Sequence, residues 1–273
     1  MYKMRLTSGW YPKEKRKCEE EIKEFSSYYQ NVQGYKRGGL VPHAGWFFCG
    51  KLICGVIQIL KNNNPDPDLI CVIGGHLTSN SPVLYLGYSE AETPLGNIKI
   101  DKVATEWITE RLEFKCLEPN NGDNTVEIVL PFVKYFFPDV PIIGFRAPSS
   151  KLSIKLGNII RDYADKNNLN LITIGAADLT HYGPNYDFMP AGFGKSGIEW
   201  ARNNDKKLID RILSLDAESV LSLANSEYSS CSPGPIASLI EFSKESKPFL
   251  LDYYTSYDIY PSDSFVGYVG ILF

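Results

Sequence analysis

Short apolar runs rich in β-branched residues alternate along this chain with longer segments of helical spacing, and this alternation most constrains the fold. The runs cover residues 38–43, 69–76, 140–147 and 169–183, the last running from a core strand into a polar turn. Such alternation implies right-handed crossovers and a parallel or mixed sheet with helices on both faces. No repeat or linker divides the chain. We therefore predict the α/β class, with one three-layer αβα domain over residues 1–273 and a mostly parallel or mixed central sheet.

Weaker patterns assign the remaining elements. Ser150 is a suitable N-cap for an amphipathic helix, and Pro131 should kink its helix or mark that helix's first turn. The predicted helices span residues 46–62, 102–114, 125–137, 150–168, 197–215, 217–225 and 232–246. Two shorter strands around a turn are expected at 81–88 and 96–101, and two final strands at 247–258 and 263–273.

Composition excludes several classes of partner. The 273 residues carry a formal net charge of −4 and no lysine or arginine tract, so we expect neither nucleic acid nor an anionic membrane as the main partner. No apolar run has the length of a signal peptide, and none approaches the ~18 residues of a membrane span. Six cysteines are spread singly, without CxxC pairs. Reduced thiols in a cytoplasmic protein are the expectation.

The three histidines all fall where a predicted strand ends. His43 ends the first run and His76 the second, while His181 lies in the polar turn that ends the fourth, three residues after Asp178. Taken singly, each residue also has a purely structural interpretation. His43 can accept hydrogen bonds from backbone N–H groups, His76 can fill a tight turn after two glycines, and Asp178 can cap a short helix. Ligands of open α/β sheets bind beyond the carboxyl ends of the strands. Because all of these residues fall at that edge, we predict one shared site.

Two neutral imidazoles from two strand ends suit a transition metal, which needs a third ligand. Asp178, Glu127 and Cys231 are the candidates. Cys231 precedes a Pro-Gly-Pro turn that opens a predicted helix, where thiolate is favoured. The other cysteines weighed, Cys49, Cys54 and Cys71, lie within apolar runs and are predicted to be packed thiols.

Two further patterns are ambiguous or misleading. "GFGKSG" at 192–197 matches G-x-G-x-x-G but follows no core strand, so we interpret it as a flexible loop near the site and not as a nucleotide-binding motif. The aromatic residues Trp46, Phe47 and Tyr182 flank the histidines. They could shape a pocket for a flat ligand, although core packing explains them equally well.

Seven segments taken in order resemble the Memo family, which includes protein B of the AmmeMemoRadiSam system and is similar in fold to class III extradiol ring-cleaving dioxygenases. "VPHAGWFFCG" is similar to the family's Pro-His-Ala-Gly-aromatic signature, and "GAADLTHYG" to its Ser-Ser-Asp-x-x-His-Tyr turn. "SGWYP" resembles its opening strand and turn. The other segments are "IGGH", "VEIVLPFV", "CSPGPI" and "SFVGYVGILF".

The resemblance implies a metal bound by His43, His76 and Cys231, with Asp178 and His181 as catalytic residues in the same pocket. The chain departs from the family pattern twice. Asp123-Asn124 stands where the family often has Glu-His, and no arginine follows Cys231. An outer or acid-base histidine is thus expected to be missing.

The ligand set and the resemblance together predict a non-haem Fe(II)-dependent oxidoreductase, dioxygenase-like, acting on a small catechol-like substrate. His181 would be its acid or base, oriented by Asp178. Because a thiolate replaces the usual carboxylate ligand, zinc or copper also suits the site. The alternatives are a non-catalytic adaptor that binds a peptide or small ligand in the same cleft, and hydrolysis by zinc-bound water. A radical-enzyme partner is implied only by the family's gene neighbourhoods. The sequence indicates no oligomeric state.

Overall fold

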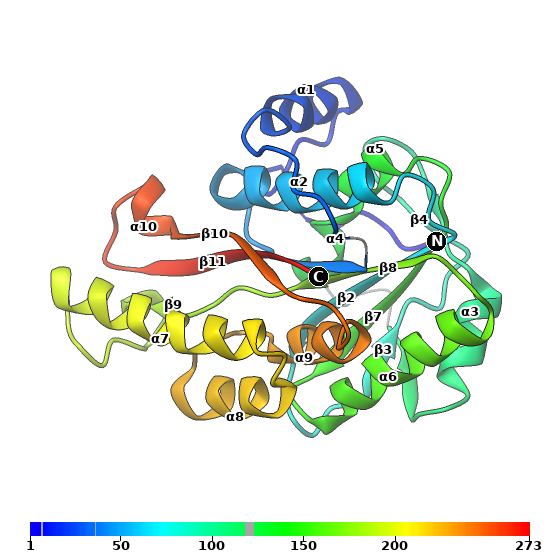
Figure 1. Cartoon of the computed structure of the whole chain (residues 1–273). Helices are drawn as coiled ribbons and strands as arrows, with labels where there is room; N and C mark the ends of the chain where they lie inside the picture. Colours follow the sequence, from blue (N-terminus) through cyan, green and yellow to red (C-terminus); the bar gives the residue numbers. More distant parts are fainter. Residues whose placement is uncertain (7, 36, 118–122) are drawn as a thin grey trace.

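Four parallel strands form the centre of the molecule. In the computed structural model, which describes residues 1–6, 8–35, 37–117 and 123–273, they are β1 (Gly38–Val41), β8 (Leu171–Ala176), β2 (Leu69–Leu77) and β7 (Ile142–Pro148), in that spatial order. Their register pairs Val41 with Ala176 and Ile73 with Gly175, so β1, β8 and β2 end side by side. The predicted mostly parallel, mixed α/β sheet is confirmed (Figure 1).

Shorter strands extend the sheet on both sides. Next to β1 lies the antiparallel β11 (Phe265–Leu272), followed by β10 (Phe249–Thr255), while β9 (His181–Tyr182) pairs with the start of β11. Beyond β7 lie β3 (Val83–Tyr85) and β6 (Phe114–Cys116). The last strand of the chain therefore borders the first one.

Helices cover both faces, as the three-layer prediction requires (Figure 1). Alternate residues of β2 point to opposite sides: Ile70 and Val72 join one buried cluster, and Leu69, Cys71 and Ile73 join another. One face carries α1 (Lys15–Phe25), α2 (Trp46–Asn63) and α5 (Leu130–Phe136). The other carries α3 (Lys102–Thr109), α6 (Lys151–Lys166), α7 (Lys195–Leu213), α8 (Ala217–Glu227) and α9 (Pro233–Phe242). Burial on both faces explains why the central strands are continuously apolar.

Several element predictions need correction. The helix expected over 102–114 ends at Thr109, and Phe114 begins β6. The helix expected over 125–137 is two helices, α4 (Asn124–Glu127) and α5, and Pro131 lies in the first turn of the second. Residues 96–101 do not pair with 81–88. Instead β5 (Ile98–Lys99) pairs with β4 (Glu90–Ala91) in a separate small sheet.

The N-terminal and C-terminal regions hold further differences. Helix α1 was not predicted, and residues 8–12 form a turn without the strand implied by the resemblance. The segment 247–258 is strand only to Thr255, after which α10 (Ser256–Ile259) begins with a capping box. Ser150 does cap α6, accepting a hydrogen bond from the Leu152 N–H at 3.4 Å.

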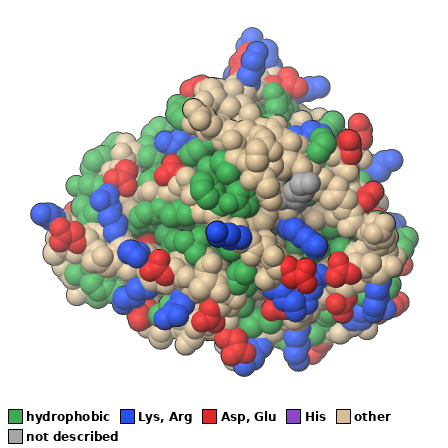
Figure 2. All heavy atoms as spheres, viewed as in Figure 1, with side chains coloured by type: hydrophobic (Ala, Val, Ile, Leu, Met, Phe, Trp, Pro, Cys, Tyr) green, Lys and Arg blue, Asp and Glu red, His purple; other side chains and the backbone are tan. Residues whose placement is uncertain are grey.

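The surface is mixed in charge. On the face shown in Figure 2, lysine and arginine side chains alternate with aspartate and glutamate, and none of the three histidines is visible. Within the described ranges, no helix is both long and apolar enough to cross a lipid bilayer.

Helices α6 and α9 cross at Gly157, where a methyl group would lie 2.2 Å from the backbone oxygen of Ser238. We expect Gly157→Ala to lower the free energy of unfolding by about 2 kcal/mol, although alanine favours an isolated helix by about 1 kcal/mol. Urea unfolding measures the difference. Gly9→Ala is the control because a methyl group there meets nothing within 4 Å. A Gly157→Ala protein as stable as the wild type would contradict the close crossing.

Candidate metal centre

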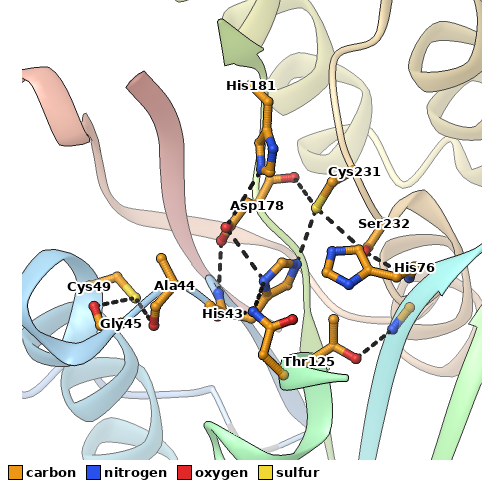
Figure 3. Close-up of polar contacts among 12 residues, drawn as sticks. His43, Ala44, Gly45, Cys49, His76, Thr125, Asp178, His181, Cys231 and Ser232 are labelled. Atoms are coloured by element: carbon orange, nitrogen blue, oxygen red, sulfur yellow. Dashed lines mark hydrogen bonds and ion pairs between the residues drawn. The ribbon is translucent and has the colours of Figure 1, made fainter. Parts of the chain in front are cut away.

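The carboxyl ends of three adjacent strands bring the predicted residues together (Figure 3). His43 lies two residues after β1, Asp178 lies two residues after β8, and His76 is the second-last residue of β2. Cys231 reaches the same place from the turn before α9. These four of the five residues predicted for this edge thus share one site, and the fifth, His181, follows three residues after Asp178.

Three of these side chains face one another as metal ligands do. One ligating atom each from His43, His76 and Cys231 lie within 4.8 Å of one another. The Nε2 of His43 is 3.1 Å from the Cys231 Sγ, and the two imidazole rings meet edge to face at 4.7 Å. Two imidazole nitrogens and a sulfur form a donor set that can hold a divalent transition metal.

The His43 ring is held by contacts to its backbone and to its Nδ1 atom, on the side away from Cys231. Its backbone N–H donates to Asp178 Oδ1 at 2.8 Å, and its Nδ1 lies 3.5 Å from Asp178 Oδ2. The Asn124 amide donates to the His43 carbonyl at 2.8 Å and lies 3.2 Å from the same Nδ1. These contacts leave Nε2 directed at Cys231 (Figure 3). Ligand histidines are commonly oriented in this way through the second ring nitrogen.

The His76 ring is held by a different carboxylate. Its Nδ1 lies 2.9 Å from Asp123 Oδ2, which also pairs with the Arg146 guanidinium at 3.1 Å. The backbone of His76 has a left-handed φ of 56°, and its N–H donates to the Ser232 hydroxyl at 3.1 Å. A non-glycine residue in this conformation is strained, and such strain is found at ligand sites.

Asp123 and Asn124, the pair that departs from the resembled pattern, therefore each contact one ligand histidine. The histidine of the resembled pattern is absent, but each ligand imidazole still has a polar side chain beside its second ring nitrogen. Sequence reasoning identified the substitution and did not identify these contacts.

Neighbouring charges tune the site. Burial raises the pKa of Cys231, but the surrounding His43, His181 and His76 lower it well below the usual range of a thiol. Burial lowers the pKa of His76, and contacts with Asp123 and Cys231 more than compensate, raising it to about 10. The site thus favours a thiolate, the form of cysteine that ligates metals.

His181 and Asp178 form the other side of the site. His181 Nε2 lies 3.8 Å from Asp178 Oδ2 and is buried without a hydrogen-bond partner among the described residues. The turn between them is anchored at Thr180, whose N–H donates to Asp205 Oδ1 at 2.9 Å. Asp205 also accepts from the Tyr253 hydroxyl at 2.7 Å. The buried Asp205 on α7 therefore fixes the segment that carries His181.

A cavity of about 240 Å³ opens beside the thiol of Cys231. Sequence reasoning missed its aromatic wall, although Tyr186 and Phe188 follow His181 closely and Tyr228 stands three residues before Cys231. The lining residues are His181, Tyr186, Phe188, Tyr228, Ser230 and Cys231.

The three aromatic residues considered in the sequence as pocket walls do not line this cavity. Trp46 is buried against Phe132, with ring centroids 4.3 Å apart, and its indole N–H donates to a backbone oxygen. Phe47 is exposed on α2. Tyr182 stacks on Phe265 in the core. The core-packing interpretation therefore holds for Trp46 and Tyr182.

The loop at 192–197 does not line the cavity. Gly192 and Gly194 have left-handed backbones, and the Gly192 carbonyl accepts from the Tyr182 hydroxyl at 2.7 Å. The motif opens α7, and no β-strand leads directly into it.

Glu127, one of the three candidate third ligands, lies outside the cluster. Its buried carboxylate accepts hydrogen bonds from the N–H groups of Arg5 and Leu6 and from the Tyr11 hydroxyl, at 2.7–3.0 Å. Its role in the structure is to fasten the N-terminal segment. Cys49, Cys54 and Cys71 are buried, as predicted.

Asp205 gives a pH-dependent prediction. Burial raises its pKa to about 6, against hydrogen bonds from Thr180 and Tyr253 that lower it. The folded state therefore keeps this proton to a higher pH than the unfolded chain, and the contribution of Asp205 to stability falls as pH rises from about 4 to about 6. We expect the free energy of unfolding of the wild type, relative to Asp205→Asn, to fall by up to about 3 kcal/mol over this window.

Urea unfolding across the pH range measures this difference. The control is Asp210→Asn, which removes an exposed acid from the same helix. A wild type-to-Asp205→Asn difference that stays constant with pH would contradict the buried, proton-retaining carboxyl.

The chain is similar to known proteins over nearly its whole length. A family profile described as "Memo-like protein" matches residues 3–272. A MEMO1 family protein of Pyrococcus furiosus is 28% identical over 253 residues, covering 86% of this chain and 85% of its own. One from Pyrobaculum aerophilum is 30% identical over 256 residues, covering 88% and 84%. A solved structure, an uncharacterized protein from Escherichia coli K12, superposes with a TM-score of 0.50 at 11% identity, over 85% of this chain and 98% of that one. This last likeness concerns the fold alone.

Proposed function

This chain belongs to the Memo-like family, and we propose that it is a metal-dependent oxidoreductase that binds Fe(II) through His43, His76 and Cys231. The substrate we propose is a small catechol-like molecule, transformed by dioxygenase-like chemistry. The observation that carries the proposal is the grouping of three ligating atoms within 4.8 Å, beside a cavity that Cys231 itself lines.

The residues present fit a metal ion. Both imidazoles have a partner on the ring nitrogen opposite the cluster, Asp178 with Asn124 for His43 and Asp123 for His76. The third donor is a sulfur favoured as thiolate. Three protein ligands leave open positions on a metal, as catalytic sites require.

Within this proposal, the metal supplies a Lewis acid and an electron source for dioxygen. The protein's own groups orient the substrate and move its proton. His181 lines the cavity, and its imidazole is placed to take a proton from a substrate hydroxyl. Asp178, 3.8 Å away, orients that imidazole and stabilises its charged form. The aromatic side chains Tyr186, Phe188 and Tyr228 would contact the substrate beside the metal ligands.

A second candidate function is supported by Cys231. Dioxygenases of the resembled class use a carboxylate as third ligand, whereas a thiolate suits zinc or copper. With such a metal the chain would serve as a binding or adaptor protein, holding a small or peptide ligand in the same cavity without turnover.

Metal content tests the ligand set. We expect His43→Ala, His76→Ala and Cys231→Ala, purified without a histidine tag, each to lose most of the metal that the wild type retains. Asn124→Ala, which removes only an outer contact to His43, should weaken binding by about 10–100-fold. Elemental analysis by mass spectrometry gives both content and identity, with circular dichroism to verify folding.

Cys116→Ser is the matched control, since Cys116 is an exposed thiol on β6 away from the cluster. Retention of full metal content by all three ligand variants would rule out the site.

Oxygen consumption tests the reaction. After anaerobic loading with Fe(II), the wild type should consume oxygen with at least one member of a catechol panel, and the zinc-loaded protein should not. His181→Ala should lower kcat by about 10²–10⁴-fold while keeping its iron, because it removes the proton-transfer group and no ligand. Iron-loaded protein that is inert with every catechol would favour the binding-protein function instead.

A further inference from the structure

We propose that the rings of Tyr186, Phe188 and Tyr228 form a binding site for a single uncharged aromatic ring, whose polar substituent points toward Cys231 and His181. The inference deepens the proposed function and rests on it for the metal-facing end of the site. It assigns specificity to three residues outside the ligand set.

Two separate loops supply these rings. Tyr186 ends the short helix η1 (Pro184–Tyr186), and Phe188 follows after Asp187, whose backbone is left-handed with φ 51°. Tyr228, after α8, is itself left-handed with φ 52°. Both turns hold non-glycine residues in a disfavoured conformation where they present aromatic side chains to the cavity.

Core packing does not account for the three rings. Tyr228 is 66% exposed and Tyr186 is 41% exposed, so both leave large apolar surfaces in solvent. Phe188 is held from behind by Trp200, with ring centroids 5.5 Å apart at 73°, and meets Tyr228 at 5.1 Å. Tyr186 packs on the His181 ring at 4.7 Å. A fixed ring with two exposed rings beside it suits stacking and edge contacts with another aromatic group.

The volume of the cavity matches a ligand with one ring. An apolar protein cavity of about 150 Å³ holds benzene, and drug-sized ligands occupy about 300–1,000 Å³. At about 240 Å³, this cavity fits a monocyclic molecule with a few substituents.

The lining also limits the ligand's charge. None of the six lining residues is lysine, arginine, aspartate or glutamate. The Ser230 hydroxyl already donates to the Asp178 carbonyl at 2.7 Å, which leaves His181 and Cys231 to meet a polar substituent. A phosphate group would find no lysine or arginine among these lining residues to balance its charge. A phenolic hydroxyl is uncharged, and it can form a hydrogen bond with the His181 imidazole beside Cys231.

Binding to the zinc-loaded full chain tests the inference without turnover. By calorimetry, catechol should bind at least about tenfold more tightly than cyclohexane-1,2-diol, which has paired hydroxyls without a flat ring. Phenyl phosphate should bind no better than the cyclohexanediol. Phe188→Ala and Tyr228→Ala should each weaken the binding of catechol by about tenfold.

Tyr260→Ala is the matched control, because Tyr260 is also 66% exposed and lines no part of the cavity. Phe188→Leu keeps an apolar side chain of similar size but removes the aromatic ring. It should therefore lower the affinity for the aromatic diol more than the affinity for the saturated diol. Equal affinities for the two diols, or ring variants that bind like Tyr260→Ala, would overturn the inference.

Metal-free protein separates this inference from the proposed function. Phenol should still bind it and should lose affinity in Phe188→Ala. If phenol binds in this way but no metal is retained, the ring site stands and the metal function fails. If metal is retained but ring substitutions change no affinity, the metal function stands and the ring site fails.

Discussion

The buried residue Asp178 connects several parts of this site through its side chain and its backbone. Its oxygens accept the His43 N–H and lie near the ring nitrogens of His43 and His181. Its backbone carbonyl accepts from the Ser230 hydroxyl and lies 3.7 Å from the Cys231 sulfur. Because β8 lies between β1 and β2, a residue just beyond its end lies beside the residue that follows β1 and the end of β2. The parallel order of three strands is thus the physical basis of the whole arrangement.

Cys231 depends on a second constraint, the close approach of α9 to the sheet. A methyl group on Gly234 would lie 2.3 Å from the Ala147 carbonyl and 2.5 Å from that of Pro148. Only glycine lets the first turn of α9 rest on the end of β7 and bring the thiol to the histidines. The Pro-Gly-Pro sequence is explained by this packing as well as by helix initiation.

The sequence predicted the central strands and the shared edge because buried parallel strands are continuously apolar and their ends are abruptly polar. It did not predict α1, where Cys18 and Ile22 are the buried residues of an otherwise charged segment. Edge strand β6 has three residues, of which Phe114 was placed in the preceding helix and the other two were assigned to no element, for the same reason. In each case the element has too few buried residues for a hydrophobic repeat to be recognised in the sequence.

Within the site, His43 and His76 were predicted as ligands from their residue type and their place at strand ends. Cys231 was one of three candidates for the third ligand, and the resemblance implied it. Asp123 matters because it faces the back of the His76 ring, which spacing along the chain does not reveal. The aromatic wall comes from two loops whose left-handed turns have no sequence period.

This division has a chemical consequence. The ligands and their partners His43, His76 and Asp178 are set by the sheet, so a loop change can leave them in place. Tyr186, Phe188 and Tyr228 stand on loops outside that framework. Loops on a rigid scaffold tolerate substitution more readily than the scaffold itself. One metal-binding framework can therefore serve different ligands through changes confined to these two loops, and the ligand of this chain is best sought from the shape of its aromatic wall.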